Sequence, residues 1–374
     1  MALGLQTVLT PNAGGGTFTV LTPAVASKIK DSIFLNQTNA LNNPQIVSQQ
    51  NRIQSNLQRD LNKVGVEQFT QTDLKRGAES ALKFTDDAIG RINLIRTRID
   101  SAIKIALQAD EGDATSFASL ATTFDTFVNQ IIDTAETGPS PNLLSELPQS
   151  SFKFATNTGG STFTINPVFL GSGYTITEDV SGDQFVRINS TKTIEEVSGT
   201  TGSFTGVSAP IFGGVRLDSF DSATNAIGIT LAPSTAGATS ITGTLSKSGI
   251  GVGNAFIYDN LESQTGRDRA IADLQAAKVI LDQQIIKFNA AQAQAQLVFN
   301  KAETQLSDLL DKTDVLTAVA ELKVQAVAAQ AEKLNELNVN RLQAQTAFRK
   351  ELTNLIPVNG RIGSFTSALI DVFI

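Results

Sequence analysis

Apolar side chains recur every three or four residues through a long stretch near each end of the chain. In the first stretch, from Gln45 to about Gln108, this spacing predicts an amphipathic helix. Acidic residues around Gly112 predict a turn, and a second helix follows and stops at Gly138-Pro139. The predicted apolar stripes contain Ile46, Ile53, Leu57, Leu61 and Val64, then Leu82, Ala88, Ile89, Ile92, Ile95, Ile99, Ile103 and Ala106, and after the turn Phe117, Leu120, Phe124, Phe127, Val128, Ile131 and Ile132.

The stretch from about Leu261 to Leu355 carries the longest periodic pattern. Its first part keeps the 3-4 spacing over about five heptads, which predicts a coiled-coil seam. At ~1.5 Å per residue, residues 267–310 would extend over roughly 65 Å. A kink or a restart is predicted at Asp311-Lys312-Thr313-Asp314. The seam consists of Ile271, Leu274, Leu281, Ile285, Phe288, Ala295, Phe299, Ala302, Leu306 and Leu309, and a looser stripe follows with Leu316, Val319, Val327, Leu334, Leu337, Leu342, Phe348 and Leu352.

An Ala/Gln tract at 290–296 lies inside the seam. Small residues allow two helix backbones to approach closely, while the glutamines stay in water. This pattern favours a close helix–helix contact over a low-complexity segment, and the partner helix could come from the same chain or from a neighbour.

Residues 150–258 follow a different pattern, with short alternating runs separated by Gly, Asn and Asp. Such runs predict short antiparallel strands. They include 152–154, 162–165, 174–177, 184–188 and 227–231.

The predicted fold is α+β, with an antiparallel rod of N- and C-terminal helices and an inserted β domain. We divide the chain into an N-terminal arm (1–22), an N-terminal rod (23–149), the inserted β domain (150–260), a C-terminal rod (261–356) and an apolar tail (357–374). Strand-competent segments at 17–21 and 365–374 are hydrophobic. We expect them to pair with each other or with an adjacent subunit.

Composition excludes several function classes. The chain has no histidine and no cysteine, which removes the commonest general base, cysteine nucleophiles and thiolate metal sites. The net charge is −7 and no block of Lys/Arg exists, so no nucleic-acid partner is expected. No apolar run approaches the ~20 residues of a transmembrane helix. We expect a protein that is not an enzyme.

Acidic groups in the sequence are weak candidates for chemistry. Asp110, Glu111 and Asp113 lack the ligand spacing of a calcium loop, and acidic residues near the start of a helix explain them better. The pairs Asp86-Asp87 and Glu195-Glu196 are adjacent in sequence, so their side chains point in different directions. The glycines at 249, 251 and 253 lack the spacing and the Lys-Ser/Thr of a phosphate-binding loop. We predict no catalytic residue, no cofactor and no metal.

The run from Ala88 to Leu144 resembles the N-terminal rod of bacterial flagellins and of the related hook–filament junction proteins. The resemblance rests on 88–92, on 103–109, on the helix 117–132, and on Gly138 with Asn142-Leu143-Leu144. Residues 313–322 look like the returning rod helix of that family. The family's Arg-Leu-Ser-Ser-Gly-type signature in the first helix is absent, and Pro357 ends the last helix before the terminus. A divergent filament protein of this architecture is the reading that the resemblance favours.

The predicted function is structural: a subunit that assembles with copies of itself into an extracellular filament through its rod, with the β domain facing solvent. The alternative is a secreted adhesin, or a junction or tip protein that forms no long filament. An enzyme hidden in the β domain is a third, weaker reading. The residues predicted to pack between subunits are Val20, Ile92, Ile99, Ile103, Phe124, Ile131, Leu281, Ile285, Phe288, Phe299, Leu306, Phe365 and Phe373.

The N-terminus lacks the charged and apolar regions of a cleaved secretory signal. We therefore expect export to the cell surface by a flagellar, type III-like route, with an export chaperone as a possible partner. A type I route is the competing expectation, because Asp371-Val372-Phe373-Ile374 resembles the uncleaved C-terminal signal of its substrates.

Overall fold

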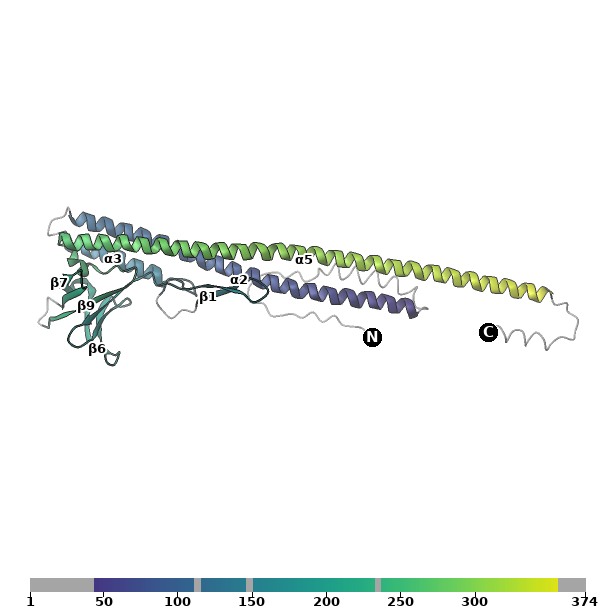
Figure 1. Cartoon of the computed structure of the whole chain (residues 1–374), viewed down its shortest axis with the longest axis horizontal. Helices are drawn as coiled ribbons and strands as arrows, with labels where there is room; N and C mark the ends of the chain where they lie inside the picture. The colour runs from purple at the N-terminus through teal and green to yellow at the C-terminus, as the bar shows by residue number, and fades with distance from the viewer. Residues whose placement is uncertain (1–43, 111–115, 146–150, 233–236, 356–374) are drawn as a thin grey trace. The chain divides into compact units, whose positions relative to one another are not determined.

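The computed structural model describes residues 44–110, 116–145, 151–232 and 237–355 of the 374-residue chain. The predicted arm and tail lie outside these residues, together with Val20, Phe365, Phe373 and the acidic residues Glu111 and Asp113. The described part combines long helices with antiparallel sheets, so the predicted α+β fold class is confirmed (Figure 1).

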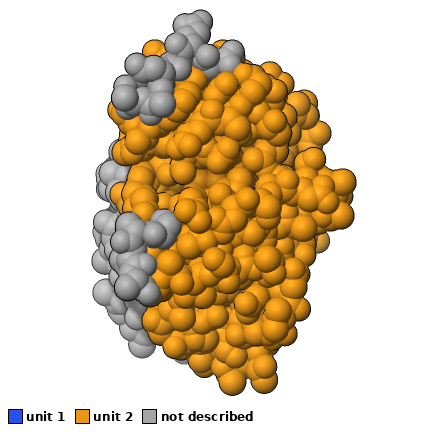
Figure 2. All heavy atoms as spheres, turned by 90° about the vertical axis from the view of Figure 1, so that its left-hand side faces the viewer, with its two compact units in different colours: residues 1–67, 308–374 blue, residues 68–307 orange. Residues whose placement is uncertain are grey.

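The chain divides into two compact units. Unit 1 comprises residues 1–67 and 308–374, and unit 2 comprises residues 68–307; Figure 2 draws them in different colours, and the described atoms visible in it belong to unit 2. Helices α2 (Pro44–Asp110) and α5 (Gln264–Leu355) contribute residues to both units. The other described elements belong to unit 2.

In unit 2, α2 buries one row of residues at alternating three- and four-residue spacing, mostly Ala and Ile. This spacing is typical of a coiled-coil seam. Thr85 lies within the row, and its Oγ1 donates a hydrogen bond to the carbonyl of Ala81 at 2.8 Å, so the buried hydroxyl is satisfied. The row consists of Leu74, Ala78, Ala81, Thr85, Ala88, Ile92, Ile95, Ile99, Ala102, Ala106 and Ala109.

Helix α5 presents a matching buried row within unit 2. It contains Leu274, Ala277, Leu281, Phe288, Ala291, Ala295, Val298 and Ala302. Three ion pairs join the two helices: Arg96 with Asp282 at 2.6 Å, Asp100 with Lys278 at 2.7 Å, and Lys75 with Glu303 at 3.1 Å. Residue numbers fall on α5 as they rise on α2, so the helices run antiparallel in this unit.

Helix α3 (Phe117–Glu136) connects the helices of unit 2 to the sheet. Its apolar stripe is buried at Phe124, Val128, Ile131 and Ile132, as the sequence predicts. These residues share one continuous core with the seams of α2 and α5 and with the inner face of the sheet.

The β part of unit 2 consists of a hairpin and a larger sheet. The hairpin pairs β1 (Phe152–Ala155) with β2 (Thr162–Ile165). The seven-stranded antiparallel sheet has the order β6-β5-β4-β3-β9-β8-β7. Its strands are β3 (Ser172–Glu178), β4 (Gln184–Ile188), β5 (Thr193–Val197), β6 (Phe204–Pro210), β7 (Val215–Asp221), β8 (Ala226–Leu231) and β9 (Thr239–Gly249), with the short α4 (Ile211–Gly214) before β7.

The first and last strands of the larger sheet lie side by side at its centre. Strand β3 pairs with β9 over its whole length, with Tyr174 opposite Lys247 and Ile176 opposite Leu245. This pairing brings the entry and the exit of the inserted segment together. The chain can therefore leave the helices and return to them from neighbouring points.

A tight turn returns the chain to α5. The 3-10 element η1 (Ala255–Leu261) buries Phe256, Ile257, Tyr258 and Leu261. Asp259, Asn260 and Leu261 all have positive φ, a conformation that costs free energy for residues with a Cβ. The buried side chains on both sides hold this turn in place.

In unit 1, the described parts of α2 and α5 bury much less. Ile46 packs with Val327 and Ala331, and Glu67 pairs with Lys312 at 3.7 Å. Ile46 meets α5 near residue 330, whereas Glu67 meets it at Lys312, so the two helices are again antiparallel. Every residue of α5 from Glu332 to Glu351 is exposed.

The predicted kink at 311–314 is wrong. Helix α5 continues through these residues without a break. Asp311, Lys312 and Asp314 are exposed, so the polar run is a solvated turn of the helix and not a helix end.

Candidate assembly surface

The structure places the predicted subunit-packing residues of the described helices inside a single chain. Ile92, Ile99, Phe124, Ile131 and Leu281 have no exposed surface, and Phe288 has almost none. Ile103, Ile285, Phe299 and Leu306 are half-buried. All but Leu306 belong to the unit 2 core or pack against it. Their contact with another subunit remains a prediction, and the exposed surfaces described below are better placed for that role.

Arg91 holds the C-terminus of α3 against α2. Its guanidinium donates hydrogen bonds to the carbonyls of Thr134 and Ala135 at 3.3 and 3.2 Å, and it pairs with Asp87 at 2.8 Å. The last carbonyls of a helix lack partners within the helix and carry its negative partial charge, so a buried cation there is stabilising. Arg91 is 9% exposed.

Asn142 completes this joint from the segment after α3. Its side chain accepts from Arg91 at 2.9 Å and donates to the carbonyls of Ala135 and Glu136 at 2.9 and 2.8 Å. A Cβ on Gly138 would lie 2.4 Å from the Arg91 guanidinium. The glycine and the asparagine of the sequence resemblance therefore have a structural reason: they make room for Arg91 and bind it.

A second buried polar network joins α3 to the sheet and to η1. The carboxylate of Asp125 accepts from the side-chain amide of Asn254 at 2.8 Å and from the backbone N–H of Ala255 at 2.7 Å. Asn254 also accepts from Tyr174 on β3 at 3.2 Å and from Arg187 on β4 at 2.6 Å. Four segments that are distant in sequence thus meet at one asparagine.

Burial dominates the electrostatics of this network. It raises the pKa of Asp125 from 3.8 to about 6, although the hydrogen bonds from Ala255 and Asn254 and the charge of Arg187 act in the opposite direction. Burial also raises the pKa of Tyr174 and lowers that of Arg187. These groups are inside the core and their partners are structural, so we assign them to fold stability.

A third joint fixes the start of α5 to the sheet. The hydroxyl of Tyr258 donates to Asp273 at 2.7 Å and accepts from the backbone N–H of Gly253 at 3.0 Å. Lys247 on β9 forms an ion pair with Asp273 and lies over the Tyr258 ring, 5.3 Å from its centroid. Burial raises the pKa of Tyr258 well above its ordinary value.

Three carboxylates gather at one end of the sheet. Glu178, Asp183 and Glu196 have oxygens within 4.8 Å of one another. Neighbouring hydroxyls donate to two of them, Ser181 to Glu178 and Thr205 to Glu196, and the backbone N–H of Gly199 donates to Asp183 at 2.9 Å. The cluster therefore has hydrogen-bond donors of its own, and we assign no metal to it.

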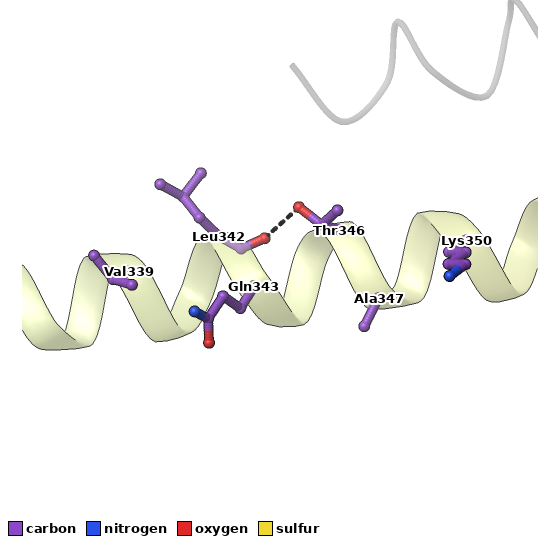
Figure 3. A pocket seen from close by; sticks show the side chains of 6 residues that line it. All are labelled: Val339, Leu342, Gln343, Thr346, Ala347 and Lys350. Atoms are coloured by element: carbon purple, nitrogen blue, oxygen red, sulfur yellow. Dashed lines mark hydrogen bonds between the residues drawn. The ribbon is translucent and has the colours of Figure 1, made fainter.

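An exposed apolar stretch of unit 1 lies on α5 between Glu332 and Glu351. Five large apolar side chains of this stretch are between 45% and 64% exposed: Leu334, Leu337, Val339, Leu342 and Phe348. An open hollow of about 360 Å³ is lined by Val339, Leu342, Gln343, Thr346, Ala347 and Lys350. Figure 3 shows all six on this one helix, so this hollow is an open surface feature and not an enclosed cavity.

The sequence pattern missed the polar networks. Arg91, Gly138 and Asn142 lie in the stretch that resembles the flagellin rod, but nothing in the pattern indicates that they meet. Asp125 carries a weak signal, because it is a charged residue within a predicted apolar stripe.

In the described residues, no helix has an apolar stretch sufficient to cross a bilayer.

Comparisons with known proteins give only distant likeness. No protein-family description matches the sequence, and no curated protein matches it. Among solved structures, FlgL of Xanthomonas campestris is 11% identical, covers 70% of this chain and 97% of its own length, and has a TM-score of 0.26. The flagellar junction protein FlgL from Legionella pneumophila is 12% identical, with 72% and 99% coverage and a TM-score of 0.27. Flagellar hook-associated protein-3 from Legionella pneumophila is also 12% identical, with 76% and 99% coverage and a TM-score of 0.22.

Proposed function

We propose that this chain is a structural subunit that assembles with copies of itself into an extracellular filament through its long helices. The observation that carries the proposal is the stretch 332–351 of α5, which is exposed throughout and presents five large apolar side chains. Several large apolar side chains exposed on one stretch of helix are typical of a protein–protein contact.

Two further features support a structural role. The polar networks of unit 2 hold helices and sheet to one another, which suits a structural subunit. The sequence from Ala88 to Leu144 resembles the rod of flagellins and hook–filament junction proteins, and its Arg91, Gly138 and Asn142 form one of these joints.

The proposal includes export to the cell surface, by a flagellar-type or type I route. Apolar surface of this kind promotes unwanted association before assembly. An export chaperone that covers residues 332–351 is therefore a second partner that we propose.

Substitution of the exposed face tests the proposal. Leu337→Ser combined with Phe348→Ser removes two large apolar groups that are each 64% exposed. Val180→Ser is the matched control, because Val180 is 90% exposed and lies in unit 2. Sedimentation velocity and electron microscopy of the purified proteins at increasing concentration provide the measurement.

We expect the wild type and Val180→Ser to form filaments and the double variant to remain dispersed with unchanged helical circular dichroism. Filaments from the double variant would reject the assigned surface. A wild type that stays monomeric at every concentration would reject self-assembly and favour the junction, tip or adhesin alternative.

A further inference from the structure

A second exposed apolar row lies on α5 within unit 2. It occupies eight exposed positions: Ala272, Ala276, Val279, Gln283, Ile286, Ala290, Ala293 and Leu297. The three large members are well exposed, Val279 at 57%, Ile286 at 68% and Leu297 at 63%. Seven of the eight residues are apolar.

The row has the spacing of a coiled-coil seam. Its members follow one another at alternating intervals of four and three residues, as do the buried residues Leu274, Ala277 and Leu281 of the inner seam. A helix that packs against a neighbour on just one side needs a single apolar stripe, with polar residues on the opposite side. Between Ala272 and Leu297, α5 has a second stripe that the described chain leaves uncovered.

Helix α2 provides an internal comparison. The row with the same spacing on the side away from its own seam contains Lys83, Asp87, Gly90, Leu94, Thr97, Ser101, Lys104 and Gln108. Leu94 is its single large apolar member. The apolar outer row is therefore a property of α5 and not of both helices.

Charge identifies the partner that this row suits. The chain carries a net charge of −7, so two copies repel each other unless they meet through a neutral face. Lys278 and Asp282 are neutralised by Asp100 and Arg96 of α2. From Gln283 to Asn300, Lys287 is the only charged residue, and the flanking polar residues are uncharged amides. A strongly charged partner would form few ion pairs with this row, whereas a second copy of the chain would not be repelled by it.

The dimensions also fit a helix partner. Alanines at four of the eight positions let a facing backbone approach closely, and the larger side chains between them provide apolar area. At a rise of ~1.5 Å per residue the row extends over about 38 Å, or several turns of a partner helix.

We propose that the outer row of α5 from Ala272 to Leu297 is a lateral contact surface that packs against a second copy of this chain. The inference rests on the proposed self-assembly and adds a surface in unit 2 to the one in unit 1.

Thiol protection tests this surface, because the chain has no cysteine and a single introduced one reports on its own site. Ile286→Cys and Ala290→Cys place a thiol in the row, and Leu94→Cys is the control on the outer side of α2, at 54% exposure in the native side chain. The rate of modification by a maleimide is measured in dilute protein, in concentrated protein and in filaments. We expect assembly to slow modification at 286 and 290 at least tenfold and to leave the rate at 94 within twofold.

Equal modification rates at 286, 290 and 94 in normal filaments would overturn the lateral surface and leave the filament intact. Protection at 286 and 290 in concentrated protein without filaments would keep the lateral surface and reject the filament. If the thiols at 286 and 290 are not protected in any of the three states, the assignment of the lateral surface is also overturned. Ile286→Asp, with Leu94→Asp as its control, should abolish this association without changing the helical circular dichroism; unchanged association would overturn the assignment.

Discussion

The helices α2 and α5 contribute to both units, but the two units bury them very differently. In unit 2, the seam residues Ile92, Ile95 and Ile99 have no exposed surface. In unit 1, Val64 is 2% exposed, Ile46 and Ala331 are 6% and 8% exposed, and α5 then continues for 20 exposed residues from 332 to 351.

The difference follows from the number of layers. Unit 2 adds α3 and a sheet, whose apolar faces share one core with the helix seams. The described part of unit 1 contains two helices, which can bury one stripe each and leave the remaining apolar residues in water. We conclude that unit 2 has the core of a self-sufficient folding unit, and we expect the described part of unit 1 to gain stability in the proposed assembly.

Core truncations should separate the two units most strongly. Phe124 is fully buried in unit 2, with its ring 5.8 Å from that of Tyr258. Phe124→Ala should lower the free energy of unfolding by about 3–5 kcal/mol. Val327→Ala, at a half-buried position of unit 1, should cost below about 1 kcal/mol. Urea unfolding followed by circular dichroism measures both, and similar losses would contradict the comparison.

The pH dependence of unfolding tests the buried network of unit 2. The folded-state pKa of Asp125 is about 6, against 3.8 in the unfolded chain. As pH rises from 4 to 6, the unfolded chain loses this proton first, so stability falls through this window and levels off above it. Asp125→Asn should remove on the order of 2–3 kcal/mol of this dependence.

Asp221→Asn is the control with the opposite sign. Hydrogen bonds from Thr224 and Ala223 lower the pKa of Asp221, so its contribution is present above the unfolded pKa and is lost as pH falls through the folded one. Unfolding curves from about pH 2 to 7.5 cover the titration of both carboxyl groups. If Asp125→Asn and the wild type have parallel stability profiles, the carboxyl does not titrate as described.

Glycine substitutions test the Arg91 joint. Gly138→Ala places a methyl group 2.4 Å from the guanidinium and should cost about 1–3 kcal/mol by displacing its hydrogen bonds. Gly90→Ala on α2 meets no atom within 4 Å and should stabilise the helix by about 0.5–1 kcal/mol. Thermal unfolding of the two variants should shift in opposite directions; a shift in the same direction would argue against the joint.

Exposed ion pairs should have the smallest effects. Lys312→Met removes the pair with Glu67 in unit 1, where both side chains are 54% exposed. Lys278→Met removes the pair with Asp100 in unit 2, where Lys278 is 33% exposed. Each change should alter the free energy of unfolding by below about 1 kcal/mol and by less at high salt. A larger loss at Lys312 would mean that unit 1 is held together better than its burial indicates.

The sequence predicts the periodic parts of the fold well, because seams follow directly from helix geometry. The helices, five of the strands and the fold class could be read from spacing. Strands β5, β6, β7 and β9 were harder to predict, since Ser, Thr, Gly and charged residues alternate weakly with apolar ones there. Polarity predicts a kink at 311–314, but these polar side chains point outward and do not interrupt the helix.

The joints could not be predicted, because they depend on side chains that meet only in three dimensions. Asp125, Arg187 and Asn254 come from a helix, a strand and a loop, and no spacing in one sequence links them. The outer row of α5 could have been found, because its 3-4 spacing is as regular as that of the inner seam. The inner seam contains more large apolar residues, so it dominates the periodic pattern of this stretch.

Hydrogen exchange measured by mass spectrometry in dilute and assembled protein tests the central claim most directly. The account predicts that backbone amides in 332–351 exchange much faster in dilute protein than in the assembly, while amides of the unit 2 seam around Ile95 are protected in both. Equal exchange of 332–351 in both states, in an assembly that electron microscopy shows to be filamentous, would contradict the claim that this helix face joins the subunits.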